Sequence, residues 1–239
     1  MYFKNQKFLV AGMSKSGESA ARFLLKRGAE VYLYDDVVSD KISALVASLE
    51  ELGAHGVDAE GLERAVSICD VLVLSPGIPI DHSLAVSFRR QGKNIIGEEE
   101  LGALYLRATA VAVTGTNGKT TTVSMINDIL CADGKHSIMC GNIGNPLANE
   151  VEQLGFDDFA VIEVSSFQLE TLSDLRPHVA VITNITEDHL NRHYNMENYI
   201  FLKGKLLRNL RGSEYAVLNY DDPIVRAFAE KVRCKVIFF

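Results

Sequence analysis

The sequence predicts an α/β protein made of two units, each a mostly parallel sheet covered by helices. Near-continuous apolar strands alternate with helical segments along the chain, which is typical of parallel sheets buried on both faces. Two strand-to-helix turns are rich in glycine, at Gly12–Gly17 and Gly115–Gly118. Such turns bind nucleotides at the carboxyl edge of a sheet. We expect a Rossmann-like domain over residues 1–94 and a phosphate-loop domain over residues 95–239.

Composition narrows the class of protein. The chain has 239 residues, 47% of them hydrophobic, which is enough for a sizeable core. A net charge of −7 without a basic cluster argues against nucleic acid as a partner. The four cysteines form no C-x-x-C pair, the amino-terminal residues contain no apolar signal core, and no apolar run reaches the ~18 residues of a membrane span. We expect a soluble, cytoplasmic monomer without membrane insertion.

The first unit has the β-α-β order of a dinucleotide fold. A strand over residues 8–12 and a helix ending near residue 28 precede a strand over residues 31–34, which delivers Asp35 at its carboxyl end. An acid about 20 residues beyond the glycine turn binds a ribose hydroxyl in such folds. Ser14 replaces the middle glycine that lets a pyrophosphate approach closely. A nucleotide in this crevice and a scaffold with an empty crevice both remain open.

A rigid loop follows the next strand of the first unit. Strand 71–74 runs into Ser75-Pro-Gly-Ile-Pro79, at the carboxyl edge of the sheet, where ligands of α/β proteins bind. This loop can line the same crevice as Asp35. Helices are expected at 41–52, 83–91 and 98–106, and a short strand at 94–96.

The second unit opens on a phosphate-loop pattern. Strand 110–114 leads into glycine-rich residues and then a helical spacing of apolar side chains. Backbone N–H groups of such a loop surround phosphate oxygens, Lys119 supplies a charge and Thr120 a hydroxyl for Mg²⁺. The general pattern has Gly where this chain has Val113, and an ordinary glycine-rich turn is the alternative. We expect these residues to bind a nucleoside triphosphate: Gly115, Thr116, Asn117, Gly118, Lys119, Thr120 and Thr121.

Two further strands bring ionisable groups to the same edge. Glu163 lies inside an apolar strand over 159–164, where a buried carboxylate needs a cation or a proton; an exposed strand end is the alternative. Asp188 and His189 follow strand 179–183. His193 is four residues beyond His189, but Leu190 replaces the glutamate of a zinc-protease helix. Other strands are expected at 137–140, 215–218 and 235–239, and the chain is expected to be a fragment of a longer protein.

Five motifs in order resemble the Mur ligases of peptidoglycan synthesis. They are Ser75-Pro-Gly77, Gly115-Thr-Asn-Gly-Lys-Thr120, Gly141-Asn-Ile-Gly144, Glu163-Val-Ser-Ser-Phe-Gln-Leu-Glu170 and Asn184-x-Thr-x-Asp-His189. The resemblance covers nearly the whole chain. It implies a UDP-binding domain followed by an ATPase domain, with a third, carboxyl-terminal domain of the family missing here. Ser165–Glu170 is most similar to family members that add D-glutamate to UDP-N-acetylmuramoyl-L-alanine.

The resemblance also implies roles for single residues. Lys119 becomes the phosphate lysine, Thr120 and Glu163 hold one Mg²⁺, and His189 is a ligand of a second metal. Lys203 in Tyr199-x-x-x-Lys203 matches a lysine that is carbamylated in these enzymes, with Lys205 as its rival. The catalytic residues are then Lys119, Lys203 and His189, and the metal ligands are Thr120, Glu163, His189 and Lys203. The implied substrate contacts are Ser14, Lys15, Asp35, Ser75, Gly77, Asn142, Gln168 and His189.

The implied reaction is ATP-driven amide formation through an acyl phosphate. Alternatives are another Mur-type ligase or one similar to folylpolyglutamate synthase. A nicotinamide oxidoreductase built on residues 1–94 and a non-catalytic nucleotide-sensing module are alternatives of other classes; Ser14 and the phosphate loop argue against the first, and the metal-ligand set argues against the second.

Overall fold

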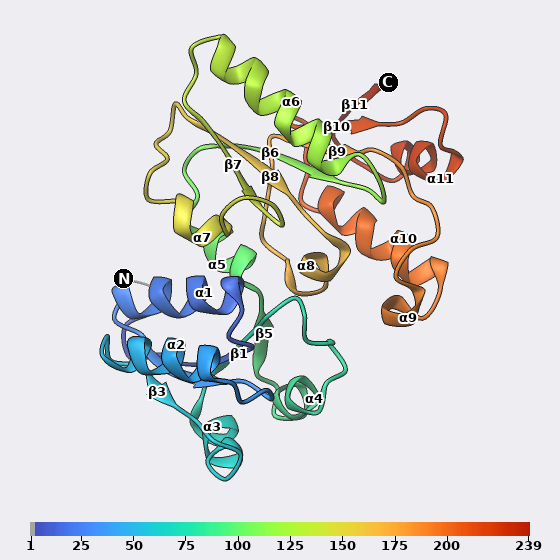
Figure 1. Cartoon of the computed structure of the whole chain (residues 1–239). Coiled ribbons are helices and arrows are strands. Elements are labelled where there is room, and N and C mark those ends of the chain that lie inside the picture. The colour runs from blue at the N-terminus through green and yellow to red at the C-terminus, as the bar shows by residue number, and fades with distance from the viewer. Residues whose placement is uncertain (1–2) are drawn as a thin grey trace. The chain divides into compact units, whose positions relative to one another are not determined.

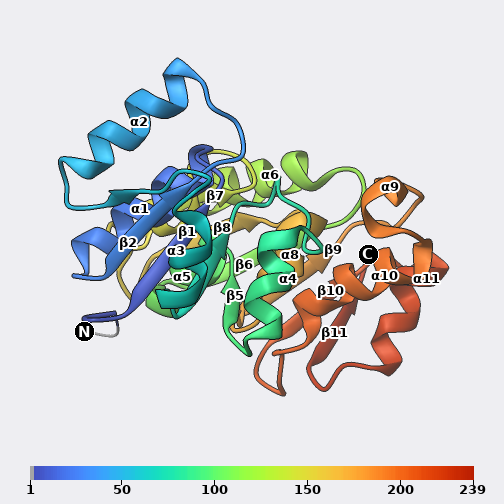
Figure 2. The same cartoon turned by 90° about the horizontal axis from the view of Figure 1, so that it is seen from below.

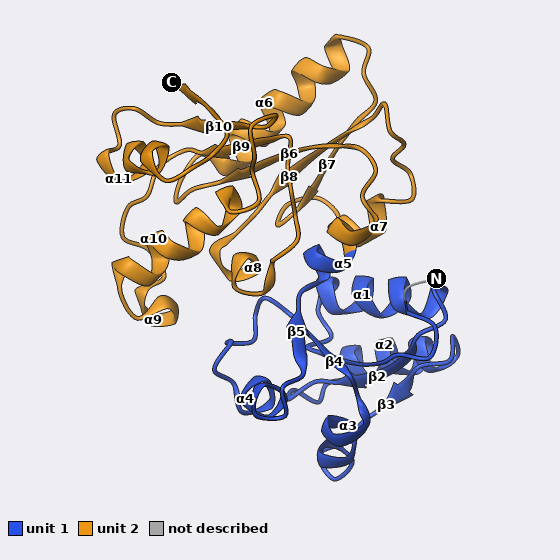
Figure 3. Cartoon of the chain, turned by 180° about the vertical axis from the view of Figure 1, so that it is seen from behind, with its two compact units in different colours: residues 1–101 blue, residues 102–239 orange. Residues whose placement is uncertain are grey.

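The computed structural model describes residues 3–239 and divides into two compact units, residues 1–101 and 102–239 (Figure 3). Residues 1–2 lie outside the described residues. They belong to the expected first domain and to the amino-terminal segment in which no signal peptide was expected. The expected boundary after residue 94 falls in β5 (Asn94–Ile96), which pairs with β4 (Val71–Leu74). The first unit therefore continues through β5.

The first unit is a five-stranded parallel sheet in the order β3-β2-β1-β4-β5 (Figure 1). Its remaining strands are β1 (Lys7–Ala11), β2 (Glu30–Tyr34) and β3 (His55–Gly56). Its helices are α1 (Lys15–Lys26), α2 (Asp40–Glu50), α3 (Leu62–Ile68) and α4 (Ser83–Arg90), and α5 (Glu98–Tyr105) runs across the division between the units.

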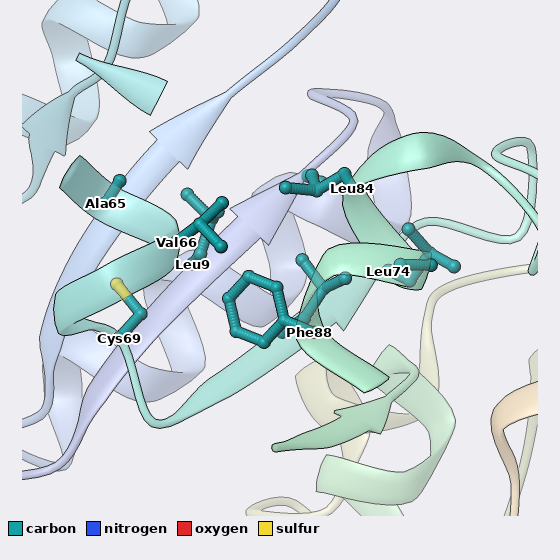
Figure 4. Packing of buried hydrophobic residues seen from close by; sticks show 10 residues of the cluster. Leu9, Ala65, Val66, Cys69, Leu74, Leu84 and Phe88 are labelled. Atoms are coloured by element: carbon teal, nitrogen blue, oxygen red, sulfur yellow. The ribbon is translucent and has the colours of Figure 1, made fainter. Parts of the chain in front are cut away.

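Alternate residues of the central strands build the core of this unit. Leu9 of β1 and Leu72 and Leu74 of β4 point to the face covered by α3 and α4, where Phe88 packs against them (Figure 4). These side chains are almost fully buried. Because side chains alternate along a strand, Phe8 and Val10 point to the opposite face, and α1 packs on β1 there.

The second unit is a six-stranded parallel sheet in the order β11-β10-β9-β6-β8-β7. Its strands are β6 (Thr109–Thr114), β7 (Ser137–Gly141), β8 (Phe159–Glu163), β9 (Val179–Ile182), β10 (Tyr215–Leu218) and β11 (Lys235–Phe238). Its helices are α6 (Lys119–Ala132), α7 (Leu147–Glu150), α8 (Ser166–Thr171), α9 (Leu190–His193), α10 (Met196–Gly204) and α11 (Pro223–Arg226). Every strand pair in both sheets is parallel, which confirms the predicted α/β class with parallel sheets.

Helices cover both faces of the second sheet. α6 packs over Val113, Val161 and Val181, whereas α10 lies on the opposite face (Figures 1 and 2). Strands β6, β8 and β9 are neighbours and parallel, so their carboxyl ends meet at one edge. Within residues 3–239, no helix combines the length and apolar character that crossing a membrane requires.

Candidate functional site

The phosphate loop joins β6 to α6 through two glycines that no other residue replaces easily. Gly115 has φ 148° and Gly118 has φ 83°, both in the region that disfavours side chains. A Cβ atom on Gly115 would lie 1.9 Å from Thr183 Oγ1, so the close approach of β9 also requires glycine. The loop is therefore preformed, with α6 beginning at Lys119.

Lys119 folds back over the loop. Its Nζ donates to the carbonyl oxygens of Gly115 at 2.9 Å and Thr116 at 2.8 Å. The N–H groups of Gly118, Lys119 and Thr120 have no acceptor among the described residues, as is usual in a first helical turn. Unpaired N–H groups, a helix N-terminus and an ammonium group together favour an anion such as phosphate.

Glu163, at the end of β8, is a buried carboxylate with neutral partners. Only 2% of the surface of Glu163 is exposed to solvent. Thr120 Oγ1 donates to Glu163 Oε2 and Asn142 Nδ2 donates to Glu163 Oε1, each at 2.7 Å. The alternative of an exposed strand end is therefore wrong. A buried carboxyl group whose hydrogen-bond partners are a hydroxyl and an amide offers oxygen ligands suited to a cation.

Lys203 of α10 lies next to the phosphate loop, although it is 1% exposed. Its Nζ donates to Gly115 O at 2.8 Å and to Thr114 Oγ1 at 3.1 Å. Burial, and secondarily the charge of Lys119, lowers the pKa of Lys203 to about 7. A large fraction of this amine is therefore neutral near pH 7.

Lys205 occupies a different environment. Its Nζ donates to the carbonyl oxygens of Leu169 and Glu170, at the carboxyl end of α8. There it satisfies carbonyl groups that the short helix leaves unpaired. The structure therefore brings Lys203, and not Lys205, to the phosphate loop.

His189 is the exposed N-cap residue of α9 and has φ 52°. Its Nε2 lies 3.4 Å from Asp188 Oδ2, and its ring packs on Phe167 of α8 with centroids 4.9 Å apart. Gln168, by contrast, is buried and uses Oε1 to accept from Ser165 N–H in the capping box of α8. The side-chain oxygen of Gln168 therefore caps the N-terminus of α8, a role that was not predicted from the sequence.

A buried cluster behind His189 was also missed by the sequence analysis. Arg192 makes a two-point ion pair with Glu170, with Nη2–Oε2 at 2.6 Å and Nε–Oε1 at 3.1 Å. His193 is buried, bonds Ser166 Oγ through Nε2 at 2.9 Å and stacks on Tyr199. Burial lowers the pKa of His193 to about 4, so the ring is neutral near pH 7. The cluster joins α8, α9 and α10 and contains no zinc-helix arrangement.

Across residues 3–239, no group of three or more His, Cys, Asp and Glu side chains is placed to hold a metal ion. A metal at Glu163 would therefore need oxygen ligands from a nucleotide or water, as Mg²⁺ usually has.

The expected nucleotide contacts of the first unit gather at the carboxyl ends of β1, β2 and β4. Met13 N–H donates to Asp35 Oδ2 at 2.6 Å, and Ser14 Oγ bonds Ser75 Oγ at 2.9 Å. A Cβ on Gly17 would lie 1.9 Å from the carbonyl oxygen of Gly12, so this glycine permits the close packing of α1 on the loop. Lys15 and Gly77 are exposed at the same edge.

A cavity of about 590 Å³ lies beside this crevice, between α2 and α3. Asp35 and Val37 line it at the end of β2, and His55 and Arg64 line it farther away. Of the residues expected to contact the nucleotide, Asp35 is the one that lines this cavity.

Both halves of the chain match known families. Residues 113–239 match the Mur ligase middle domain, and residues 6–97 match the Mur ligase MurD-like N-terminal domain. Two curated relatives are named UDP-N-acetylmuramoylalanine–D-glutamate ligase. The protein from Pelotomaculum thermopropionicum is 44% identical over 99% of this chain and 52% of its own length. The protein from Geotalea uraniireducens is 42% identical over 99% of this chain and 52% of its own length. The chain spans about half the length of these relatives.

Solved structures show the same fold at low identity. The UDP-N-acetylmuramate:L-alanyl-gamma-D-glutamyl-meso-diaminopimelate ligase from Neisseria meningitides has a TM-score of 0.63 and 20% identity, covering 98% of this chain and 78% of its own. The MurF ligase from Thermotoga maritima in complex with ADP has a TM-score of 0.52 and 17% identity, covering 99% of this chain and 48% of its own.

Proposed function

The chain belongs to the Mur ligase family, and on that premise we propose that it is part of an ATP-dependent ligase that adds D-glutamate to UDP-N-acetylmuramoyl-L-alanine. The observation that carries the proposal is the grouping of Lys119, Thr120, Glu163 and Lys203 around one preformed phosphate loop. The product would be a precursor of peptidoglycan, made in the cytoplasm for cell wall biogenesis, cell shape and cell division.

The two units divide the substrates between them. Residues 1–94 would bind the UDP end of the sugar nucleotide through Ser14, Lys15, Asp35, Ser75 and Gly77, where the start of α1 favours a diphosphate. Residues 95–239 would bind ATP at the phosphate loop. Asn142 and His189, at the same edge of the second sheet, would contact the muramoyl part of the substrate; Gln168 would act there through the α8 capping box that it completes.

The donor set at Glu163 suits Mg²⁺. A hydroxyl and a carboxylate 2.7 Å apart are both hard oxygen ligands, and the carboxylate otherwise has only neutral hydrogen-bond partners. Thr120 and Glu163 would hold the ion, which supplies positive charge against the transferring phosphate. His189 would serve a second ion from its exposed ring.

Burial of Lys203 supports its carbamylation. Carbon dioxide reacts with a neutral amine: the nitrogen bonds to carbon, one N–H proton leaves, and a carbamate anion results. A pKa of about 7 provides the neutral amine, and Lys119 nearby favours the new negative charge. The carbamate oxygens would then be metal ligands near Gly115, where the Nζ atom now lies.

The main contribution of the phosphate loop to the reaction would be electrostatic stabilisation of the transferred phosphoryl group. The carboxylate of the sugar nucleotide attacks the γ-phosphate to give an acyl phosphate and ADP, and the amine of D-glutamate displaces phosphate to form the amide. Lys119 and the free N–H groups of α6 would stabilise negative charge on the transferred group.

Other ligases of the family, and one similar to folylpolyglutamate synthase, remain the nearest alternatives. Calorimetric titration with UDP-N-acetylmuramoyl-L-alanine tests against the folate-type ligase, because such a ligase has no UDP-linked substrate to bind. We expect binding that weakens in Asp35→Asn but not in the control Asp40→Asn, which alters an exposed residue of α2. Equal binding by both variants would contradict the assignment of the crevice, and absence of binding by the unaltered chain would contradict the substrate.

A further inference from the structure

The first half of the phosphate loop, Gly115–Asn117, is hydrogen-bonded to the segment that follows β9. Thr116 N–H donates to the backbone oxygen of Asn184, and Asn117 N–H donates to Asn184 Oδ1, each at 2.9 Å. In return, Asn184 Nδ2 donates to Asn117 O at 3.0 Å. The side-chain amide of Asn184 thus pairs with the peptide groups of Asn117 through both a donor and an acceptor, much as a neighbouring strand would.

Threonines on either side of Asn184 strengthen this attachment. Thr183 Oγ1 donates to Asn117 O at 2.7 Å. Thr116 Oγ1 donates to Thr186 O at 3.1 Å and accepts from Thr186 N–H at 3.0 Å. Asn184 is the only one of these residues whose side chain bonds both the N–H and the carbonyl of one loop residue, so among the described contacts it fixes the orientation of that peptide most directly.

This pairing distinguishes two groups of N–H donors in the loop. Those of Thr116 and Asn117 are occupied by Asn184. Those of Gly118, Lys119 and Thr120 have no acceptor in the described chain. An incoming phosphate can accept hydrogen bonds from Gly118, Lys119 and Thr120 while the bonds to Asn184 stay intact, but it cannot use the N–H groups of Thr116 and Asn117 without breaking those bonds.

We propose that Asn184 is a positioning residue of the phosphate loop. It holds Gly115–Asn117 as a rigid support, so that the N–H groups of Gly118, Lys119 and Thr120 are aimed at the phosphate before it arrives. The identity of the ligand rests on the proposed function, whereas the attachment of the loop does not. Preorganisation of this kind lowers the cost of ordering the site upon binding.

Two substitutions of Asn184 separate its donor from its acceptor. Asn184→Ala removes both and leaves the N–H and carbonyl of Asn117 without their side-chain amide partner. Asn184→Asp keeps the acceptor for Asn117 N–H, but places a carboxylate oxygen against Asn117 O and adds a negative charge beside the phosphate position. Asn191→Ala, an exposed residue of α9, is the matched control.

Amide hydrogen exchange followed by NMR tests the attachment without any ligand. In the unaltered chain we expect the amides of Thr116 and Asn117 to be protected and those of Gly118–Thr120 to exchange quickly. Asn184→Ala should speed exchange at Asn117 by about tenfold while strands β6 and β9 stay unchanged; Asn184→Asp should keep that protection. Unaltered exchange at Asn117 in Asn184→Ala would overturn the proposal. If that variant does not fold, exchange at Asn117 in the unaltered chain that is as fast as exchange at Gly118–Thr120 would overturn it equally.

Binding of MgADP to the full-length protein tests the consequence. Saturating MgADP should shift and protect Gly118, Lys119 and Thr120, and its Kd should rise about tenfold in full-length Asn184→Ala but not in full-length Asn191→Ala. Equal affinity of Asn184→Ala and the unaltered full-length protein would overturn the positioning role. Failure of the unaltered full-length protein to bind MgADP would count against the proposed function instead, because the exchange experiment decides the attachment by itself.

Discussion

Replacing Lys203 by methionine should change how the stability of the chain depends on pH. Lys203 is buried beside Thr114 and Gly115, and its pKa is lowered to about 7 from an ordinary 10.5. Methionine has a similar length and no charge, so Lys203→Met removes the ionisation with little loss of volume. The comparison isolates the cost of burying an ammonium group.

The sign and size follow from proton linkage. A lysine whose pKa is lowered on folding destabilises the fold fully below the folded pKa, and the penalty disappears as the pH rises towards the unfolded pKa. Between about pH 7 and about pH 10 the unfolded chain binds one proton more than the folded chain. The free energy of unfolding should therefore rise by about 1.4 kcal/mol per pH unit in the unaltered chain relative to Lys203→Met. From pH 7 to pH 9 the difference is about 2–3 kcal/mol.

Urea unfolding in metal-free buffer without carbon dioxide measures this difference. Lys205→Met is the control, because the Lys205 ammonium lies on the carbonyl groups that end α8. A difference between the unaltered chain and Lys203→Met that stays constant from pH 7 to pH 9 would refute the reasoning, since it would mean that Lys203 keeps its ordinary pKa. The same slope in Lys205→Met would refute it as well, because the effect would then not belong to Lys203.

Three further predictions concern the proposed chemistry. Lys119→Ala in the full-length protein should abolish turnover with little change in stability, because Lys119 bonds only loop carbonyls in the free chain; near-normal turnover would remove its role. Mass spectrometry of protein kept in bicarbonate should place a carbamate on Lys203 and none on Lys205, and a short carboxylate should partly restore activity to Lys203→Ala; a fully active Lys203→Ala would contradict this. By calorimetry, residues 1–239 should bind UDP-N-acetylmuramoyl-L-alanine more tightly than ATP, because the resemblance places part of the ATP site in a region beyond this chain; tight ATP binding without binding of the sugar nucleotide would reverse the assignment of the two units.

Much of the fold follows from local patterns. Many of the strands were predicted closely because a short apolar run is followed by a turn-forming residue: Pro76 comes two residues after Val71–Leu74, and Asn219 comes directly after Tyr215–Leu218. The two-residue strand β3 (His55–Gly56) and the seven-residue helix α3 were missed. Neither has enough residues to display a period. β3 is held by pairing with β2, and α3 is held by Ala65 and Val66, which pack in the core.

The site was less accessible to sequence reasoning because it depends on distant contacts. Thr120 and Glu163 were grouped by the family resemblance, and their side chains are hydrogen-bonded in the structure. Nothing in the local pattern distinguishes Lys203 from Lys205, and only the family resemblance favoured Lys203. In the structure Lys203 on α10 bonds the phosphate loop, whereas Lys205, just after the end of α10, bonds the carbonyl groups at the end of α8. The pairing of Asn184 with Asn117 is likewise a product of β9 lying next to β6.

Amide formation by the full-length protein is the most direct measure of the central claim. The assay supplies UDP-N-acetylmuramoyl-L-alanine, ATP and Mg²⁺ with D-glutamate, L-glutamate, L-lysine or meso-diaminopimelate in turn, and follows the new sugar nucleotide by mass. We predict one ADP and one phosphate per amide, with D-glutamate as the accepted amino acid. Preference for another amino acid, or formation of no amide with any of them, would contradict the account.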